Sequence, residues 1–417
     1  MSKKFILAIA LLAASLNAGA QDTQFKWYGF IRNYAVADSR ESVYGTEDFF
    51  YYLPKDRNVV DGQDLNSERT FAFAAITSRL GLDVTGYQVE GWKVGAKLEA
   101  DFYAGVSGVT GTALFRLRQA FLTMNKNAFT LKVGQAWHPM AADMPHVFAL
   151  NTGAPFGPFS RTPQATVDLK LAEELTLTAS ALWQMQYTSA GPNGASADYI
   201  KYAGTPEVYV GLGYKANGFA AKAGVDVLSI KPRHDDGVRK VSDRITTVSP
   251  FLYAEYSKGL FAVKAKTIFA QAGEHMNLNG GYGVTSVKAD GSYEYAPTRN
   301  SSSWVSFSYG KKAQFVLFGG YVRNFGTAKE LVSSNKSHIF FSKNSFSNMN
   351  RMFRITPEMM FNWGKVTLGL EYELTSVQYG DYKTINGVKY LGNWGLAEDN
   401  LHWITNHRVQ GLVRFSF

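Results

Sequence analysis

The chain has 417 residues, 14% of them aromatic, and a formal net charge of +9 at pH 7. It contains no cysteine, which excludes thiol catalysis, thiolate metal centres and disulfide cross-links. The 23 Tyr, 29 Phe and 39 Gly, with a mean hydropathy of -0.16, are typical of amphipathic strands and not of a helical protein. The positive charge favours attraction of anions, although it also serves solubility.

The first predicted element is a secretory signal peptide at residues 1–20. Two lysines precede an apolar run from Phe5 to Leu16, and small residues follow it. The apolar run is about 12 residues long, whereas a membrane-spanning helix needs about 20. Cleavage after Ala20 predicts a mature chain of residues 21–417. Its net charge is +9 less the two lysines, or +7.

Beyond the signal peptide, apolar and polar residues alternate in segment after segment. In "KVTLGLEYEL", Val366, Leu368 and Leu370 share one face, and Thr367 and Glu371 lie on the other. A period of two over about ten residues predicts a strand with one apolar and one polar face. About sixteen such strands are expected, near residues 24–36, 70–84, 92–103, 113–125, 129–137, 163–172, 174–187, 206–217, 219–230, 245–257, 259–271, 302–310, 313–324, 351–362, 365–376 and 405–417.

The connections between these strands alternate between short and long. Short ones such as "NG" (217–218) and "NWGK" (362–365) carry residues that accept the positive φ of tight turns. The alternation predicts a single domain with turns at one end and loops at the other. The long connections are 37–69, 137–162, 188–205, 231–244, 272–301, 325–350 and 377–404.

The distribution of charges and aromatics predicts which face is outside. Charged residues such as Arg79 and Glu371 lie at strand centres on the polar face, whereas aromatics such as Trp183 and Trp363 end the apolar faces. A polar interior with an apolar band and aromatic girdles is typical of an outer-membrane β-barrel, with short periplasmic turns and long outer loops. A soluble sandwich is the alternative, but a chain of about 400 residues exceeds the usual size of one.

The chain ends in "NHRVQGLVRFSF", which continues the alternation to Phe417. In a barrel the last strand pairs with the first, because no edge can stay open in lipid. We therefore expect Val409, Gly411 and Phe417 to face lipid. A terminal Phe on such a strand also resembles the end by which the barrel assembly machinery recognises outer-membrane proteins.

Six segments in order carry a family resemblance: "WYGFIRNYAV", "TSRLGLDV", "AKLEADFY", "LFRLRQAFL", "LKVGQAWHPM" and "SRTPQATVDLKL". Together they resemble the DcaP-like trimeric outer-membrane porin family. The resemblance covers the first half of the chain well and the second half only in pattern. It implies a sixteen-stranded homotrimer in the Gram-negative outer membrane that passes small hydrophilic solutes, mostly anions. We also expect no cofactor, no metal and no nucleic-acid partner.

In porins of this kind the loop after the fifth strand narrows the lumen. The corresponding segment here, 138–161, is apolar and rich in proline, which is costly for a loop exposed to water. We expect it to fold inward, with a trimer contact or a collapsed surface loop as the alternatives. The candidate constriction residues are His138, Met140, Asp143, His146, Phe148, Phe156, Phe159 and Arg161.

Cations outnumber anions on the predicted lumen faces. Rings of Arg or Lys select anions in pores, so we predict a preference for anions such as carboxylates, carried first by Arg79, Arg116 and Arg118. The alternative is that these cations pair with wall carboxylates and hold the barrel in shape. The candidate pore-lining residues are Arg32, Arg79, Lys97, Glu99, Arg116, Arg118, Lys132, Asp168 and Lys170.

No motif selects a catalytic site. The sequence has no G-x-S-x-G elbow, no H-E-x-x-H pair and no P-loop, so we predict that it is not an enzyme. A barrel enzyme that hydrolyses lipid or peptide, and an adhesive or structural barrel with a closed lumen, remain the alternatives. Gly29, Ala35 and Gly411 are small residues on the predicted outer faces, where a neighbouring barrel of a trimer could pack.

Overall fold

The computed structural model describes residues 23–105, 109, 112–341 and 347–417. The predicted signal peptide, residues 1–20, lies outside this part of the chain and stays a prediction. Among the described residues, none of the helices has the length and apolarity needed to cross a membrane.

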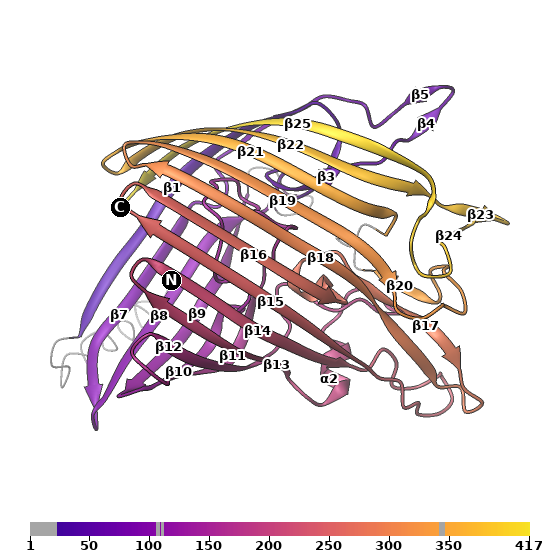
Figure 1. The fold of residues 1–417 in the computed structure, drawn as a ribbon, viewed down its shortest axis with the longest axis horizontal. Helices are drawn as coiled ribbons and strands as arrows, with labels where there is room; N and C mark the ends of the chain where they lie inside the picture. The colour runs from indigo at the N-terminus through magenta and orange to yellow at the C-terminus, as the bar shows by residue number, and fades with distance from the viewer. Residues whose placement is uncertain (1–22, 106–108, 110–111, 342–346) are drawn as a thin grey trace.

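In the described part of the chain, sixteen long strands form a closed antiparallel barrel (Figure 1). Each strand pairs with its neighbour in the chain, and β1 pairs with β25 to close the sheet. This confirms the predicted fold. The strands are β1 (Gln24–Asp38), β7 (Arg79–Val89), β8 (Trp92–Tyr103), β9 (Leu114–Lys126), β10 (Phe129–Trp137), β11 (Arg161–Lys170), β12 (Leu175–Leu182), β13 (Glu207–Ala216), β14 (Phe219–Ile230), β15 (Ile245–Lys258), β16 (Phe261–Gln271), β18 (Tyr293–Gly310), β19 (Ala313–Thr327), β21 (Met349–Trp363), β22 (Val366–Asp381) and β25 (Asp399–Ser416).

Most strand bounds follow the sequence pattern, but β12 ends at Leu182 and not near residue 187, β22 continues to Asp381, and β25 begins at Asp399 and not near residue 405. Two further departures are larger. The segment predicted as one strand at 70–84 is two, β6 (Thr70–Ala74) and β7, because Thr77 between them takes a φ of 63°. Strand β18 begins at Tyr293 and not near residue 302, because its first residues pair with a short strand, β17 (Gly281–Val287).

The two faces of the wall differ as predicted. On β25, Arg408 and Gln410 are 0% and 1% exposed, whereas Val409 and Val413 are 47% and 53% exposed. The charged side chains therefore point into the barrel and the apolar ones point out. In a bilayer the exposed apolar side chains would contact lipid, which is the arrangement that a spanning barrel requires.

The long connections gather at one end of the barrel, and the C-terminus lies at the other, beside the short turns (Figure 1). The sequence pattern predicted these connections as plain loops, but they contain short elements of their own. These are β2 (Ser42–Gly45), β3 (Phe50–Pro54), β4 (Val59–Val60), β5 (Gln63–Asp64), α2 (Asp198–Ala203), the 3-10 helix η1 (Gly273–Met276), β17, β20 (Ile339–Phe341), β23 (Lys383–Ile385) and β24 (Val388–Tyr390).

The apolar core lies inside the barrel and not between layers. Three connecting segments supply it together with inward side chains of the wall: the β2–β3 hairpin, residues 138–160 and the η1 region. From these segments Leu53, Phe156 and Met276 are 0% exposed. The lumen is therefore partly filled, which decides where a solute could pass.

The C-terminal Phe417 is paired with the first strand. Its backbone N–H donates to the Gly29 carbonyl at 3.0 Å, and its carbonyl accepts from the Gly29 N–H at 3.2 Å. A Cβ at Gly29 would lie 2.6 Å from the Phe417 ring, so the glycine leaves the space that the ring fills. The Phe417 ring therefore covers Gly29, and Gly29 cannot pack against a neighbouring barrel. The expectation from the sequence that it could do so is wrong.

We expect deletion of Phe417 to reduce the amount of assembled barrel in the membrane several-fold, with little change in the conductance of the barrels that do assemble. The deletion removes the two hydrogen bonds to Gly29 and an aromatic contact far from the lumen. The measurement is the heat-modifiable band in isolated membranes. Phe415→Ala, on the same outward face, is the control, and normal levels of the truncated protein would contradict the expectation.

Candidate functional site

Residues 138–160 cross the inside of the barrel and bind opposite parts of its wall. The Tyr34 hydroxyl donates to the Phe148 carbonyl at 2.9 Å, and the Phe148 N–H donates to Glu358 Oε2 at 2.9 Å. On another part of the wall, Lys266 Nζ donates to the Met140 carbonyl at 2.6 Å. These contacts join the segment to β1, β21 and β16, so it lies within the barrel.

Two glycines of the wall receive aromatic side chains of this segment. A Cβ at Gly320 on β19 would lie 2.4 Å from the Phe156 ring, and one at Gly369 on β22 would lie 2.6 Å from the Phe148 ring. Real side chains do not approach so closely, so any larger residue at either position would displace a ring. The wall and the segment are therefore fitted to each other.

The remaining loop candidates also have wall partners. Asp143 forms an ion pair with Lys222 at 2.9 Å, and the His146 N–H donates to Ser306 Oγ at 3.1 Å. The Phe159 ring meets the Trp137 ring edge-on at 5.0 Å. Arg161 was predicted as a loop residue, but it is the first residue of β11, because its backbone pairs with Trp137 on β10.

An arginine cluster lies on the inner wall of β7, β8 and β9. Arg116 donates hydrogen bonds to both carboxylate oxygens of Asp101, each at 3.0 Å. Arg118 bridges Glu99 at 2.7 Å and Asp101 at 2.9 Å, and Arg79 lies 3.7 Å from Glu99. The three arginines proposed as an anion ladder are therefore paired with carboxylates, the arrangement that the sequence left open as the alternative.

Two further arginines beside this cluster have no carboxylate partner among the ion pairs of the described residues. Arg32 Nε donates to Thr77 Oγ1 at 2.7 Å. The Arg161 guanidinium lies over the Trp137 ring at 4.7 Å, and its buried Nη1 has no hydrogen-bond partner. Five arginines therefore meet Glu99 and Asp101 on this part of the wall. Glu274 lines a lumen cavity together with Arg116 and Arg161, and a cationic excess survives these three carboxylates.

Two cavities lie along this side of the lumen. One, of about 440 Å³, is lined near the loop end by Tyr44, Tyr52, Arg116 and Arg161. The other, of about 560 Å³, is lined by Trp137 and by residues near the short turns. The Trp137 ring has Arg161 at 4.7 Å and Arg118 at 5.9 Å, so this stack lies where the two cavities approach each other.

The predicted residues Lys132, Asp168 and Lys170 all line the second cavity. Asp168 accepts a hydrogen bond from Thr178 Oγ1 at 2.5 Å. Lys97 is paired with Asp83 at 2.5 Å and donates to the Tyr28 hydroxyl at 3.0 Å, which in turn donates to Glu99 at 3.1 Å. The pore-lining candidates thus divide into the arginine cluster, to which Lys97 is connected through Tyr28, and a group at the turn end.

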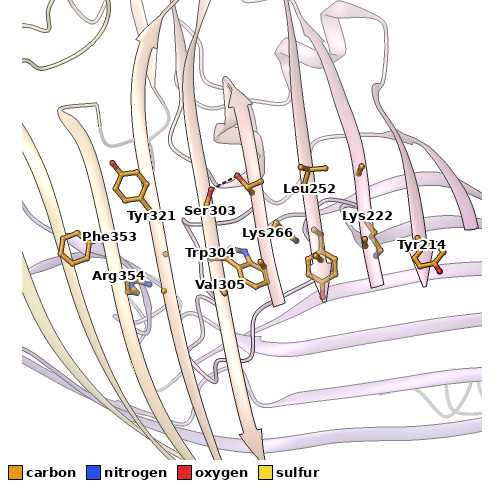
Figure 2. A pocket seen from close by; sticks show the side chains of 18 of the residues that line it. Tyr214, Lys222, Leu252, Lys266, Ser303, Trp304, Val305, Tyr321, Phe353 and Arg354 are labelled. Atoms are coloured by element: carbon orange, nitrogen blue, oxygen red, sulfur yellow. Dashed lines mark hydrogen bonds between the residues drawn. The ribbon is translucent and has the colours of Figure 1, made fainter. Parts of the chain in front are cut away.

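A concave region of about 950 Å³ belongs to the outer surface of the wall. Figure 2 shows Leu252 and Tyr321 on this surface, with Thr267 bonded to Ser303 at 2.7 Å. Leu252 and Tyr321 are exposed, whereas Lys266 and Trp304 behind them are buried on the lumen side. This region would face lipid or another barrel, and it takes no part in the lumen.

His138 belongs to a buried cluster that the sequence interpretation missed. Its Nε2 lies 3.0 Å from Glu207 Oε1 and 3.6 Å from Asp226 Oδ1, and His275 Nε2 lies 3.3 Å from Glu207 Oε1. Burial alone lowers the pKa of His138, but the two carboxylates raise it to about 9. The same opposing causes raise the pKa of His275 well above its usual value. Period two cannot reveal this cluster, because its members come from two strands and two separate loops.

The β2–β3 hairpin was also missed as an inward segment. The Tyr52 carbonyl accepts from Arg354 Nη2 at 2.8 Å, and the Pro54 carbonyl accepts from the Tyr379 hydroxyl at 2.7 Å. The signal was present in the apolar run "FFYYLP" (49–54), because a loop so apolar is as costly in water as residues 138–161.

Comparisons with known proteins agree with this geometry at the level of the fold. No family model matches the sequence, and no curated protein is similar to it in sequence. Among solved structures, the outer membrane channel DcaP of Acinetobacter baumannii is similar with a TM-score of 0.67 at 19% identity, covering 95% of this chain and 97% of that chain. The chain has the porin fold. The resemblance inferred from the six sequence segments is thereby confirmed for the fold.

Two other structures with the porin fold are similar at lower identity. The anion-selective porin from Comamonas acidovorans has a TM-score of 0.55 at 11% identity, covering 95% of this chain and 100% of that chain. The trimer form of the outer membrane protein OmpT of Vibrio cholerae has a TM-score of 0.53 at 12% identity, with the same coverage.

Proposed function

We propose that this barrel is an outer-membrane porin through which small hydrophilic solutes diffuse passively, with a preference for anions such as carboxylates. One observation carries the proposal: five arginines meet three carboxylates where two lumen cavities approach each other. Arg116 and Arg161 line the cavity at the loop end, so an anion entering from that side meets them before it meets the Trp137 stack.

The location follows from the surface of the barrel. Apolar side chains are exposed along the outward faces of the strands, an arrangement that is stable in lipid and costly in water. Solved structures with this fold are described as outer membrane channels and porins, which supports the same location. Export by the predicted signal peptide would bring the chain there.

The physical basis of selectivity is the unbalanced charge. Glu99 and Asp101 neutralise part of the arginine cluster, and the excess raises the local anion concentration. Guanidinium groups stay charged near neutral pH and bind carboxylates through two parallel hydrogen bonds. Several weak contacts in series allow an anion both to enter and to leave.

The test of the function is conductance across a planar bilayer. Purified protein should give stepwise current increments without added ligand or energy source. An adhesive or structural barrel with a closed lumen would give none. Assays for lipid and peptide hydrolysis on the same preparation test the enzymatic alternative, and turnover without conductance would replace the proposal.

We also propose a homotrimer, on which the pore itself does not depend. Ala35 and Gly411 are paired neighbours on the outer face, and a Cβ at Gly411 would meet no atom within 4 Å. This flat, small-residue surface leaves room for the wall of a neighbouring barrel.

We expect Gly411→Trp to convert the trimer to monomers, because the indole would occupy the space between subunits. Light scattering in mild detergent measures the change, and heat-modifiability reports whether the barrel stays folded. Val248→Trp, on the outward face of β15, is the matched control and should leave the trimer intact. A wild-type protein that is monomeric in mild detergent would contradict the proposed assembly.

A further inference from the structure

Four buried side chains from four segments converge on one point inside the barrel. His138 begins the inward segment after β10, His275 lies in η1, and Glu207 and Asp226 lie on β13 and β14. Each of the four is at most 2% exposed. Burying two carboxylates in this way is costly unless each is paired or binds a metal.

We propose that His138, His275, Glu207 and Asp226 bind one divalent transition-metal ion, with Zn²⁺ the preferred occupant. The donor-to-donor distances are 3.0 and 3.6 Å from His138 Nε2, and 3.3 and 3.8 Å from His275 Nε2, to the carboxylate oxygens. Bond lengths of about 2.0–2.2 Å in a tetrahedral zinc site place neighbouring donors roughly 3.4 Å apart. These four spacings bracket that value. The donors of His138, Glu207 and Asp226 all lie within 4.8 Å of one another and form the core of the site, and His275 is outside that group and must approach the ion to complete it.

Unpartnered atoms point to the same use. Glu207 Oε2 is a buried atom without a hydrogen-bond partner, and His275 Nε2 and Asp226 Oδ1 have only ion-pair contacts that lack hydrogen-bond geometry. A bound ion or water would give each of these atoms a partner. His275 Nδ1 lies 3.1 Å from the Ala272 carbonyl and donates to it, so Nε2 is the nitrogen that faces Glu207 and Asp226 and would lose its proton when a metal ion binds. This backbone support of the second nitrogen is typical of metal-bound histidine.

The hydrogen bond at Nδ1 makes His138 less favourable for metal binding than His275. Its Nδ1 lies 3.2 Å from the Met140 backbone N–H, which donates to it. Metal binding at Nε2 requires the proton at Nδ1, so the Met140 N–H must turn away on binding. The ligand set itself suits a closed structural site: imidazole and carboxylate are both zinc ligands, and two carboxylates neutralise the divalent charge.

A metal ion bound to these residues would link two inward segments to the wall. His138 holds the start of the segment that bears Met140 and Phe148, and His275 holds η1, whose Met276 carbonyl accepts from the Phe159 N–H at 2.9 Å. The site would therefore rigidify the narrowed part of the lumen. It does not depend on the proposed porin function, because a closed barrel could bind the same ion.

The test uses the full mature chain folded in detergent, stripped with a chelator and then titrated with ZnCl₂. We expect one zinc ion per chain by elemental analysis and a higher unfolding temperature in the loaded protein. Glu207→Gln and His275→Gln should each weaken zinc binding by at least about 100-fold. His402→Gln, which alters a partly exposed His–Asp pair near the loop end, is the matched control and should bind zinc as the parent does.

The wild-type measurement decides the proposal even if a ligand variant fails to fold. Absence of bound zinc at micromolar free metal, or no change in unfolding temperature, would mean that the four residues form only an ion-pair network. Equal binding by the ligand variants and the control would place the zinc elsewhere and would overturn the proposal.

Discussion

Arg161→Gln is expected to lower the ratio of chloride to potassium permeability about sevenfold. Arg161 lines the cavity at the loop end and has no carboxylate partner among the ion pairs of the described residues, so its field acts on a permeating anion although the side chain is only 2% exposed. A unit charge about 7 Å from the ion contributes about 0.6 kcal/mol in a water-like medium. This energy favours chloride and opposes potassium, so the ratio changes by about 1.2 kcal/mol, which corresponds to about sevenfold. The measurement is the reversal potential of single variants in a salt gradient.

The control for Arg161 is a cation outside the lumen. Arg323 lies on the outward face of β19, and Arg323→Gln should leave the permeability ratio unchanged. If both variants retain the ratio of the parent, Arg161 supports the Trp137 stack and does not act on ions. The difference should shrink at high salt, because the Debye length falls to about 3 Å at 1 M.

The structure changes what is expected of Arg79, Arg116 and Arg118. Their joint replacement by Gln leaves Glu99 and Asp101 buried without their ionic partners. Breaking a buried ion pair by removing one partner costs about 3–5 kcal/mol. That triple change should therefore reduce the yield of folded barrel before it reports on selectivity, and Arg161 is the cleaner probe.

Gly320→Val should detach residues 138–160 from the wall. We expect a higher single-channel conductance and a noisier current. The new Cβ would lie 2.4 Å from the Phe156 ring, so the ring must leave its place against the wall. Overpacking of this kind typically costs about 1–3 kcal/mol, which is enough to displace a segment held by a few hydrogen bonds. Valine suits a strand, so the wall itself should tolerate the change.

The adjacent residue supplies a matched control. Gly319 lies on the same strand but faces outward, where a Cβ would meet only Val305 at 3.8 Å, an ordinary contact. Gly319→Val should therefore conduct as the parent does. Identical single-channel currents in the two variants would show that Phe156 does not restrict the lumen.

Much of the barrel could be predicted because one physical rule sets it. A strand between lipid and a polar lumen must alternate, and the alternation gave the inward face of Arg408 and the outward face of Val409. Strands β10 and β14 have the bounds that the pattern predicted. The rule fails where no lipid contact enforces it, as at Thr77 between β6 and β7 and in the first residues of β18.

The site was harder to predict because it depends on contacts between distant segments. Periodicity placed Arg116 and Arg118 in the lumen, but only the register of β8 against β9 shows that both reach Asp101. The apolar content of residues 138–161 suggested an inward fold, yet the same signal at 49–54 was overlooked. His138 and His275 lie close together because two loops pack against the same wall. No local sequence pattern encodes that packing.

The most direct test of an anion-preferring pore is the reversal potential of the wild-type protein in a planar bilayer under a tenfold gradient of KCl. We expect stepwise conductance and a reversal potential displaced toward the equilibrium potential of chloride, because the arginine excess raises the local anion concentration. A reversal potential at zero or displaced toward potassium would contradict the selectivity, and absence of conductance would contradict the pore itself.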